Sequence, residues 1–220
     1  VYVNLGRIEG IMTQSEQIPF ENYKAGQKIK FYILEVKKTN KGPQIVVSRS
    51  HPGLVKRLFE EEVPEIYEGI VQIKSVAREA GSRTKMAVRS IDEKIDPIGA
   101  CVGPKGLSGK NIVDELGDEK IDIIKYSEDP AEFISAALSP SKVVRVDIDE
   151  DEKSALVIVP DYQLSLAIGK EGQNARLAAK LTNWKIDIKS ESQAEQEMLN
   201  LENSKEIEAE DVEAEFIDQE

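Results

Sequence analysis

Gly103-Pro104-Lys105-Gly106 and Gly169-Lys170-Glu171-Gly172 are two Gly-x-x-Gly tetrapeptides whose first residues lie 66 positions apart. Each follows an apolar segment and precedes a segment with the apolar spacing of a helix, and each copy ends in a strand-like Lys-Ile-Asp-Ile. These segments are 97–102, 110–116 and 120–123 in the first copy and 162–168, 173–181 and 185–188 in the second. Two copies in the same order indicate an internal repeat, which is stronger support for a shared structure than either tetrapeptide.

Upstream of each loop, the sequence predicts a short helix and then two strands joined by a turn. The predicted helices are 64–67 and 130–138, and the predicted strands are 70–77 with 84–88 and 142–148 with 154–159. The order helix, strand, strand, helix, loop, helix, strand is that of the prokaryotic type of KH domain. We therefore expect two tandem KH domains, at residues 64–128 and 129–189.

Residues 1–50 have the pattern of short strands separated by Gly, Asn and Pro turns. The predicted strands are 1–5, 8–12, 27–37 and 44–48, one fewer than an OB barrel contains. Because Val1 already lies within this pattern, we expect an OB-type barrel whose first strand is missing, in a fragment of a longer protein. A helix at 52–62 would form the connector, 51–63, to the first KH domain. The predicted fold class is therefore α+β and multidomain.

The net charge of −12 is concentrated at the end of the chain. Residues 190–220 contain 12 Asp or Glu and one Lys, a net charge of −11, which leaves −1 for residues 1–189. A balanced body can still carry a basic stripe on one face, so the overall acidity does not exclude an RNA-binding surface. The composition of the tail predicts a solvated segment that is disordered or weakly helical.

Several classes of function are disfavoured by the composition. With one cysteine, Cys101, and one histidine, His51, the chain offers neither an internal disulfide nor a Cys/His zinc site. The stretch 104–111 resembles a phosphate-binding P-loop, but Pro104 and Asn111 replace its first Gly and its Ser/Thr. No apolar run approaches the roughly 20 residues that span a bilayer. We expect a cytoplasmic, monomeric protein that is not an enzyme and holds no cofactor or metal.

A Gly-x-x-Gly turn that leads into a helix allows the backbone of a nucleic acid to approach closely. Glycine has no Cβ to block the approach, and the exposed N–H groups at the helix start favour phosphate. The groove beside such a loop holds about four unpaired nucleotides in KH domains. The predicted RNA contacts of the two loops are Gly103, Pro104, Lys105, Gly106, Lys110, Gly169, Lys170, Glu171, Gly172, Gln173, Asn174 and Arg176. On the barrel we expect Tyr2 to stack on a base and Arg49 to bind phosphate.

The chain resembles the RNA-binding core of the NusA family of bacterial transcription elongation, termination and antitermination factors. The resemblance is carried by residues 3–12, 41–69, 78–88, 96–106, 115–123 and 167–188. It implies a barrel of the ribosomal protein S-one type followed by two KH domains that bind single-stranded nascent RNA. It also implies that the intact protein binds RNA polymerase, mainly through an N-terminal domain that this chain does not contain.

Two departures from the family pattern bear on RNA binding. Leu107, Ser108 and Gly109 stand where the family usually has a small residue, an Arg and an apolar residue, so we expect the helix after the first loop to begin later. Thr13 stands where barrels of the S-one type often have a His. One alternative is a protein–protein scaffold with weakened RNA binding. Another is an RNA-degrading phosphorylase, but it would place its KH domain before its barrel.

Overall fold

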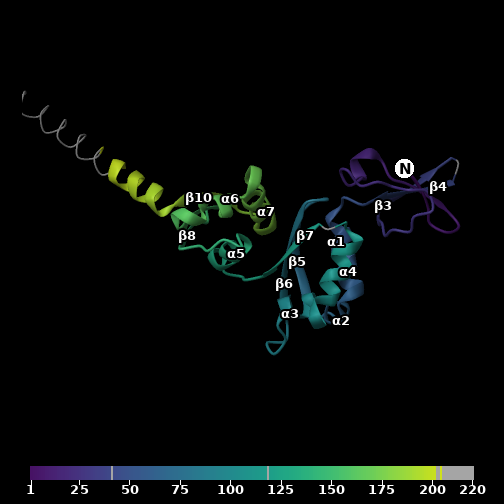
Figure 1. Ribbon diagram of the computed structural model, residues 1–220, viewed down its shortest axis with the longest axis horizontal. Helices are drawn as coiled ribbons and strands as arrows, with labels where there is room; N and C mark the ends of the chain where they lie inside the picture. Colours follow the sequence, from purple (N-terminus) through teal and green to yellow (C-terminus); the bar gives the residue numbers. More distant parts are fainter. Residues whose placement is uncertain (41, 118, 202–203, 205–220) are drawn as a thin grey trace, which may run out of the picture. The chain divides into compact units, whose positions relative to one another are not determined.

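The computed structural model describes residues 1–40, 42–117, 119–201 and 204 (Figure 1). It divides into two compact units. The first contains residues 1–137 together with 177–183, and the second contains residues 138–176 together with those that follow residue 183. No helix among the described residues is long and apolar enough to cross a membrane.

A four-stranded sheet opens the first unit. Its strands are β1 (Tyr2–Asn4), β2 (Glu9–Ile11), β3 (Tyr32–Thr39) and β4 (Gly42–Ser48), in the order β1-β2-β4-β3. The β2–β4 pair is parallel and the other two pairs are antiparallel. A 3-10 turn, η1 (Gln14–Glu16), follows β2. The small core of the sheet consists of Val3, Met12 and Val47, with Phe31 packed against it.

The first copy of the repeat has the predicted element order. Its elements are α1 (Pro52–Glu62), α2 (Pro64–Tyr67), β5 (Val71–Glu79), β6 (Arg83–Ser90), α3 (Pro97–Val102), η2 (Pro104–Gly106), α4 (Leu107–Glu115) and β7 (Lys120–Lys125). The sheet order is β5-β6-β7, with β5 antiparallel and β7 parallel to β6. Parallel pairing of β7 requires a crossover, which α3, the loop and α4 provide.

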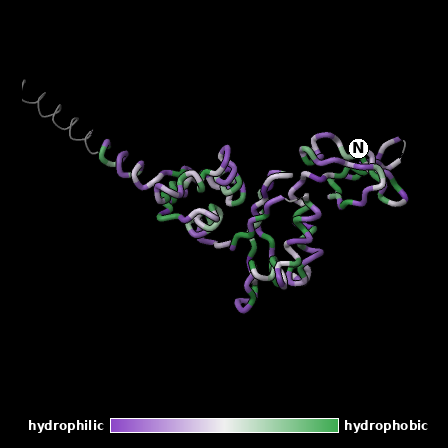
Figure 2. The backbone as a smooth tube through the Cα atoms, viewed as in Figure 1, coloured by the Kyte–Doolittle hydropathy of each residue, from purple (hydrophilic) through white to green (hydrophobic). Residues whose placement is uncertain are grey.

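One hydrophobic core holds these elements together. It includes Leu54, Leu58 and Phe59 of α1, Met86 and Val88 of β6, Cys101 of α3, and Ile112 and Leu116 of α4 and its end. Figure 2 shows the apolar stretches of this region, separated by hydrophilic segments. Because α1 contributes its apolar face to this core, it is packed as part of the first KH fold and does more than connect it to the preceding sheet.

Two buried arginines join the four-stranded sheet to the first KH fold. Arg49 is ion-paired with Glu21 at 2.5 Å and with Glu115, the last residue of α4, at 2.9 Å. Arg78 donates through Nε and Nη2 to the two carboxylate oxygens of Glu119, at 2.8 and 2.9 Å. Its Nη1 donates to the carbonyl oxygens of Arg49 and His51. This network satisfies charges that would be costly to bury unpaired.

The second copy repeats the same order. Its elements are α5 (Pro130–Ala137), β8 (Arg145–Asp149), β9 (Ser154–Val159), η3 (Asp161–Gln163), α6 (Leu164–Ile168), η4 (Lys170–Gly172), α7 (Gln173–Thr182) and β10 (Lys185–Ser190). The sheet order is β10-β9-β8, with β8 antiparallel and β10 parallel to β9. The two copies therefore share strand order and direction, as the repeat in the sequence predicts.

The start of the acidic tail is helical. Residues 191–201 form a helix that begins with a capping box: Gln193 N donates to Ser190 Oγ, and Ser190 N donates to Gln193 Oε1. Ser192 also donates to Asp161, and Lys189 is ion-paired with Glu197. Of the two states predicted for the tail, disordered or weakly helical, this segment adopts the helical one, because local capping and these contacts fix it. Residues 202–203 and 205–220 of the predicted tail lie outside the described residues.

Candidate nucleic-acid interface

The two Gly-x-x-Gly loops have nearly the same backbone conformation. Gly103 has φ 74° and ψ 173°, and Gly169 has φ 78° and ψ 169°. The third loop residues, Lys105 and Glu171, have φ 55° and 53°. In each loop the second glycine donates its N–H to the carbonyl of the first, at 3.1 Å. The two loops therefore have the same backbone shape, although the side chains at their two middle positions differ.

The first and second glycines of each loop meet different surroundings. A Cβ at Gly169 would lie 2.8 Å from Asn174 N, and a Cβ at Gly103 would lie 2.5 Å from Ser108 Oγ. These glycines allow the loop to pack onto the helix that follows. A Cβ at Gly106 would meet nothing within 4 Å, and at Gly172 only Arg176 Nη1 at 3.8 Å. The second glycines therefore keep an open surface where a ligand backbone could approach.

Helices α4 and α7 begin directly after the second glycines, so their first N–H groups adjoin the loops. The expectation that the helix after Gly106 begins later is wrong, because α4 starts at Leu107. Its first turn is fixed to α1 by Ser108 Oγ, which donates to Glu62 O, and by Asn111 Nδ2, which donates to Glu62 Oε2. This tertiary anchoring offsets the cost of Gly109 in the helix, about 1 kcal/mol.

The structure brings the predicted charged residues of the loops to the surface. Lys105, Lys110 and Lys170 are exposed, and Pro104 is exposed between the glycines of the first loop. Arg176, also exposed, donates from Nη1 to the carbonyl oxygen of Glu171 at 3.0 Å, so its guanidinium lies against the second loop. Gln173 is half-buried at the start of α7. Each loop therefore presents positive charge beside a helix N-terminus.

A hollow of about 510 Å³ adjoins the first loop. Gly103, Pro104 and Ser108 line it on the loop side. The start of α2 and the segment before and within α3 supply the rest of its lining, namely Pro64, Glu65, Ile95, Asp96, Gly99 and Ala100. The first loop is therefore bordered by a partly apolar space that carries two carboxylates.

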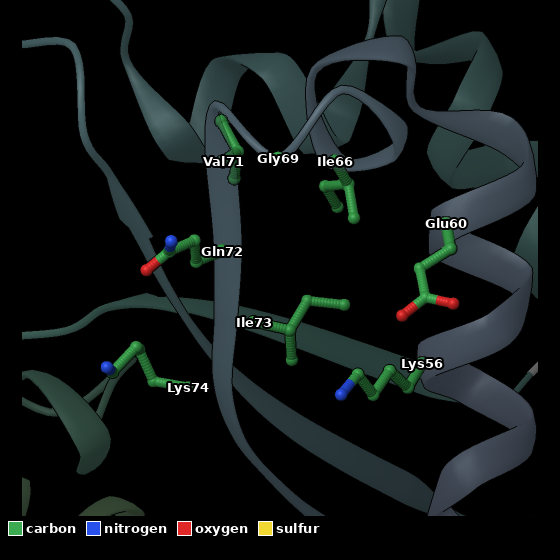
Figure 3. A pocket seen from close by; sticks show the side chains of 8 residues that line it. All are labelled: Lys56, Glu60, Ile66, Gly69, Val71, Gln72, Ile73 and Lys74. Atoms are coloured by element: carbon green, nitrogen blue, oxygen red, sulfur yellow. The ribbon is translucent and has the colours of Figure 1, made fainter.

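A second hollow lies between α1, α2 and the edge strand β5. Figure 3 shows Ile73 pointing toward Lys56 and Glu60 of α1, with Ile66 above them, while Gln72 and Lys74 point away from this space. None of the predicted RNA contacts lines it. We therefore do not include it in the candidate interface.

Comparison with known proteins supports the assignment of the two repeats as KH domains. The family model for the NusA-like first KH domain matches residues 49–126, and the model for the NusA-like second KH domain matches residues 130–196. The chain is 63% identical over 196 residues to the transcription termination/antitermination protein NusA of Halalkalibacterium halodurans, covering 89% of the chain and 51% of that protein. It is 64% identical over 194 residues to NusA of Bacillus subtilis, covering 88% of the chain and 52% of that protein.

The chain belongs to the NusA family. It is also 53% identical over 186 residues to NusA of Thermus thermophilus, covering 84% of the chain and 48% of that protein. The chain spans about half the length of the curated NusA relatives. The predicted resemblance to NusA and the prediction of two tandem KH domains are both confirmed. The first match begins at residue 49 and so includes α1.

Two residues predicted as RNA contacts of this NusA-family chain are buried. Arg49 has no exposed surface, and all its donors point to Glu21, Glu115 and the Lys30 carbonyl. Asn174 is 1% exposed, and its Nδ2 donates to the carbonyl oxygens of Leu138 and Ala167. Their side chains hold the fold together and are not available to a ligand in this structure. Both predictions are corrected accordingly.

Other surface residues near the NusA-type loops were not predicted from the sequence. In the second KH domain, Tyr162 is 77% exposed just before α6, and Leu166 of α6 is exposed. Gln163 Oε1 accepts from Lys142 N, which brings the segment before β8, with exposed Val144, beside η3. In the sequence, the signal for this surface was a tyrosine two residues before an apolar helical segment. On the four-stranded sheet, Tyr2 is 75% exposed, as a stacking residue requires.

Proposed function

We propose that this chain binds single-stranded RNA through its two Gly-x-x-Gly loops and does not alter it chemically. The observation that carries the proposal is the common geometry of the loops: an open second glycine, an adjoining helix N-terminus and exposed lysines. The proposed contacts are Gly103, Pro104, Lys105, Gly106, Lys110, Gly169, Lys170, Glu171, Gly172, Gln173, Arg176 and Tyr2. The RNA would pass as one unpaired strand from domain to domain.

The four-stranded sheet supports an OB-type barrel as the first domain. An OB barrel without its first strand would retain four strands, with its second and last remaining strands side by side and parallel. The observed order β1-β2-β4-β3, with β2 parallel to β4, has this arrangement. A hollow of about 570 Å³ beside this sheet is lined by residues 1–5, 23–29 and 31. We propose domain boundaries at 1–50, 51–63, 64–128, 129–189 and 190–220.

For the intact protein we propose the role of a cytoplasmic transcription factor that acts on pausing, termination and antitermination. Its relatives carry the name transcription termination/antitermination protein NusA. A factor of this kind must reach RNA as it emerges, and two KH domains in tandem would hold the nascent strand. RNA polymerase is the proposed second partner, bound mainly by a region outside this chain. We expect the chain to be a monomer.

The test is a titration of the chain with a labelled unstructured RNA of about a dozen nucleotides, enough for several KH footprints. The variant carries Lys105→Asp and Lys170→Asp, one charge reversal in each loop. The matched control carries Lys56→Asp and Lys153→Asp, which change the net charge equally away from the loops. Asp is tolerated at φ 55° and 52°, the values at Lys105 and Lys153.

We expect the loop variant to lose at least about tenfold in affinity at low salt, and the control variant to lose much less. The slope of log affinity against log salt should also be shallower for the loop variant, because fewer phosphates are neutralised. Equal losses in the two variants would place the RNA elsewhere. If the parent chain binds no RNA at low salt, the proposed function is wrong.

A further inference from the structure

The hollow beside the first loop is a compartment with two kinds of lining. Pro64, Ile95 and Ala100 give it apolar walls, and Gly103 and Pro104 form its border with the loop. Nucleobases are flat and apolar on their faces but carry hydrogen-bonding groups on their edges. A space of about 510 Å³ lined by both apolar and polar residues suits such a group.

The charged side chains that line this compartment are both carboxylates. Asp96 and Glu65 line it, and no lysine or arginine does so. The charges of both carboxylates act on the buried thiol of Cys101, whose pKa rises to about 12 chiefly through burial and then through these two charges. Both carboxylates therefore lie close to the same point of α3. Negative charge repels phosphate, so the compartment is suited to a base, while the loop and Lys105 are suited to the backbone.

The two carboxylates are not equally available. Asp96 caps α3: Ile98 N donates to its Oδ1 at 3.1 Å, and Gly99 N donates to its Oδ2 at 3.0 Å. Glu65 is half-buried at the start of α2, and its carboxylate has no hydrogen-bond or ion-pair partner among the described residues. A carboxylate of this kind accepts hydrogen bonds and cannot donate them. Glu65 therefore offers unoccupied acceptors to whatever enters the compartment.

We propose that this compartment holds an unpaired nucleobase that carries an exocyclic amino group, and that Glu65 selects it by accepting from that group. The proposal rests on the proposed RNA binding and adds a preference for bases to it. Adenine and cytosine present an amino donor where uracil presents a carbonyl acceptor. A carbonyl facing Glu65 would place two acceptors together and leave the carboxylate without a donor.

The experiment measures the affinity of the full chain for four RNAs of about a dozen nucleotides at one salt concentration. Oligocytidine is compared with oligouridine, and oligoadenosine with an oligomer of purine riboside, which lacks only the amino group. Homopolymers remove any dependence on binding register. The variant is Glu65→Gln, which keeps the shape but replaces one acceptor by a donor. The matched control is Glu68→Gln, which removes the same charge from an exposed residue that does not line the compartment.

We expect the parent chain to prefer the amino-bearing RNA of each pair by between about fivefold and 150-fold, the range of a good side-chain contact to a base. Glu65→Gln should reduce both preferences to within about twofold, and Glu68→Gln should leave them unchanged. If Glu65→Gln instead tightens all four RNAs equally, Glu65 acts only as a repelling charge and the proposal is wrong. Equal affinities of the parent for both members of each pair refute this proposal while leaving RNA binding intact. The absence of any binding refutes both.

Discussion

Glu119→Gln should destabilise the first unit more than any surface substitution, because Glu119 is the partner of a fully buried arginine. Both side chains of the Arg78–Glu119 pair have no exposed surface. The Glu119 carboxylate also accepts from Gly81 N at 2.8 Å and from Thr84 Oγ1 at 2.6 Å. Removing its charge leaves the Arg78 guanidinium buried and uncompensated, and breaking such a pair costs about 3–5 kcal/mol.

The assay is urea unfolding, followed by hydrogen exchange with peptides from β5–β6 and from β8–β9 read separately. With a urea dependence of about 2 kcal/mol per molar, the β5–β6 midpoint should fall by about 2 M. The single tryptophan, Trp184, lies in the second unit and provides a fluorescence signal for it. That signal should change far less than the β5–β6 peptides.

The control for this prediction is Glu128→Gln, which breaks the ion pair with Arg89 at the surface. The side chains of Arg89 and Glu128 are 45% and 76% exposed, so solvent screens this pair and its loss should cost below about 1 kcal/mol. Equal shifts of the midpoint for Glu119→Gln and Glu128→Gln would contradict the reasoning from burial. A larger shift in the β8–β9 peptides than in β5–β6 would contradict the assignment of the network to the first unit.

Three further predictions concern single residues. Gly169→Ala should lower the melting temperature far more than Gly106→Ala, since only the former places a Cβ against backbone, although both have positive φ; similar losses would refute the distinction. Asn174→Leu should cost about 1–3 kcal/mol in urea unfolding, because the carbonyls of Leu138 and Ala167 lose their donor; unchanged stability would show that another donor replaces it. With a pKa of about 12, Cys101 should resist iodoacetamide up to about pH 10 in the folded chain and react readily in urea; rapid alkylation of the folded chain would contradict its burial.

Local patterns predicted most of the KH folds correctly. The bounds of α1, α2 and β9 agree with the sequence prediction residue for residue, because proline starts, apolar spacing and turn residues are local signals. Helix α3 coincides with the apolar segment 97–102. The role of Arg49 could not be predicted from local patterns. Its ion-pair partners Glu21 and Glu115 lie 28 and 66 residues away in sequence. An arginine at the end of a strand has the same sequence signature whether it faces RNA or a buried carboxylate.

For a related reason, the sequence identified some residues of the candidate site correctly and not others. The loop glycines and exposed lysines belong to one short motif, so the sequence identified them together. Asn174 belongs to the same stretch, but the packing of the second loop onto α7 turns its amide toward the carbonyls of Leu138 and Ala167. Glu65 lies 38 residues before Gly103 and joins the site only through tertiary folding. Residues that a fold brings together from distant segments carry no common spacing.

The two loops also allow the contributions of shape and of charge to the proposed RNA binding to be compared. Lys105 and Glu171 occupy equivalent positions with φ 55° and 53°, and their charges are opposite. Because the backbone is the same in both, the N–H groups and the helix start are the features that the two sites share. In the proposed function, the side chains at these positions adjust the affinity of each loop, and the part common to both loops comes from the backbone.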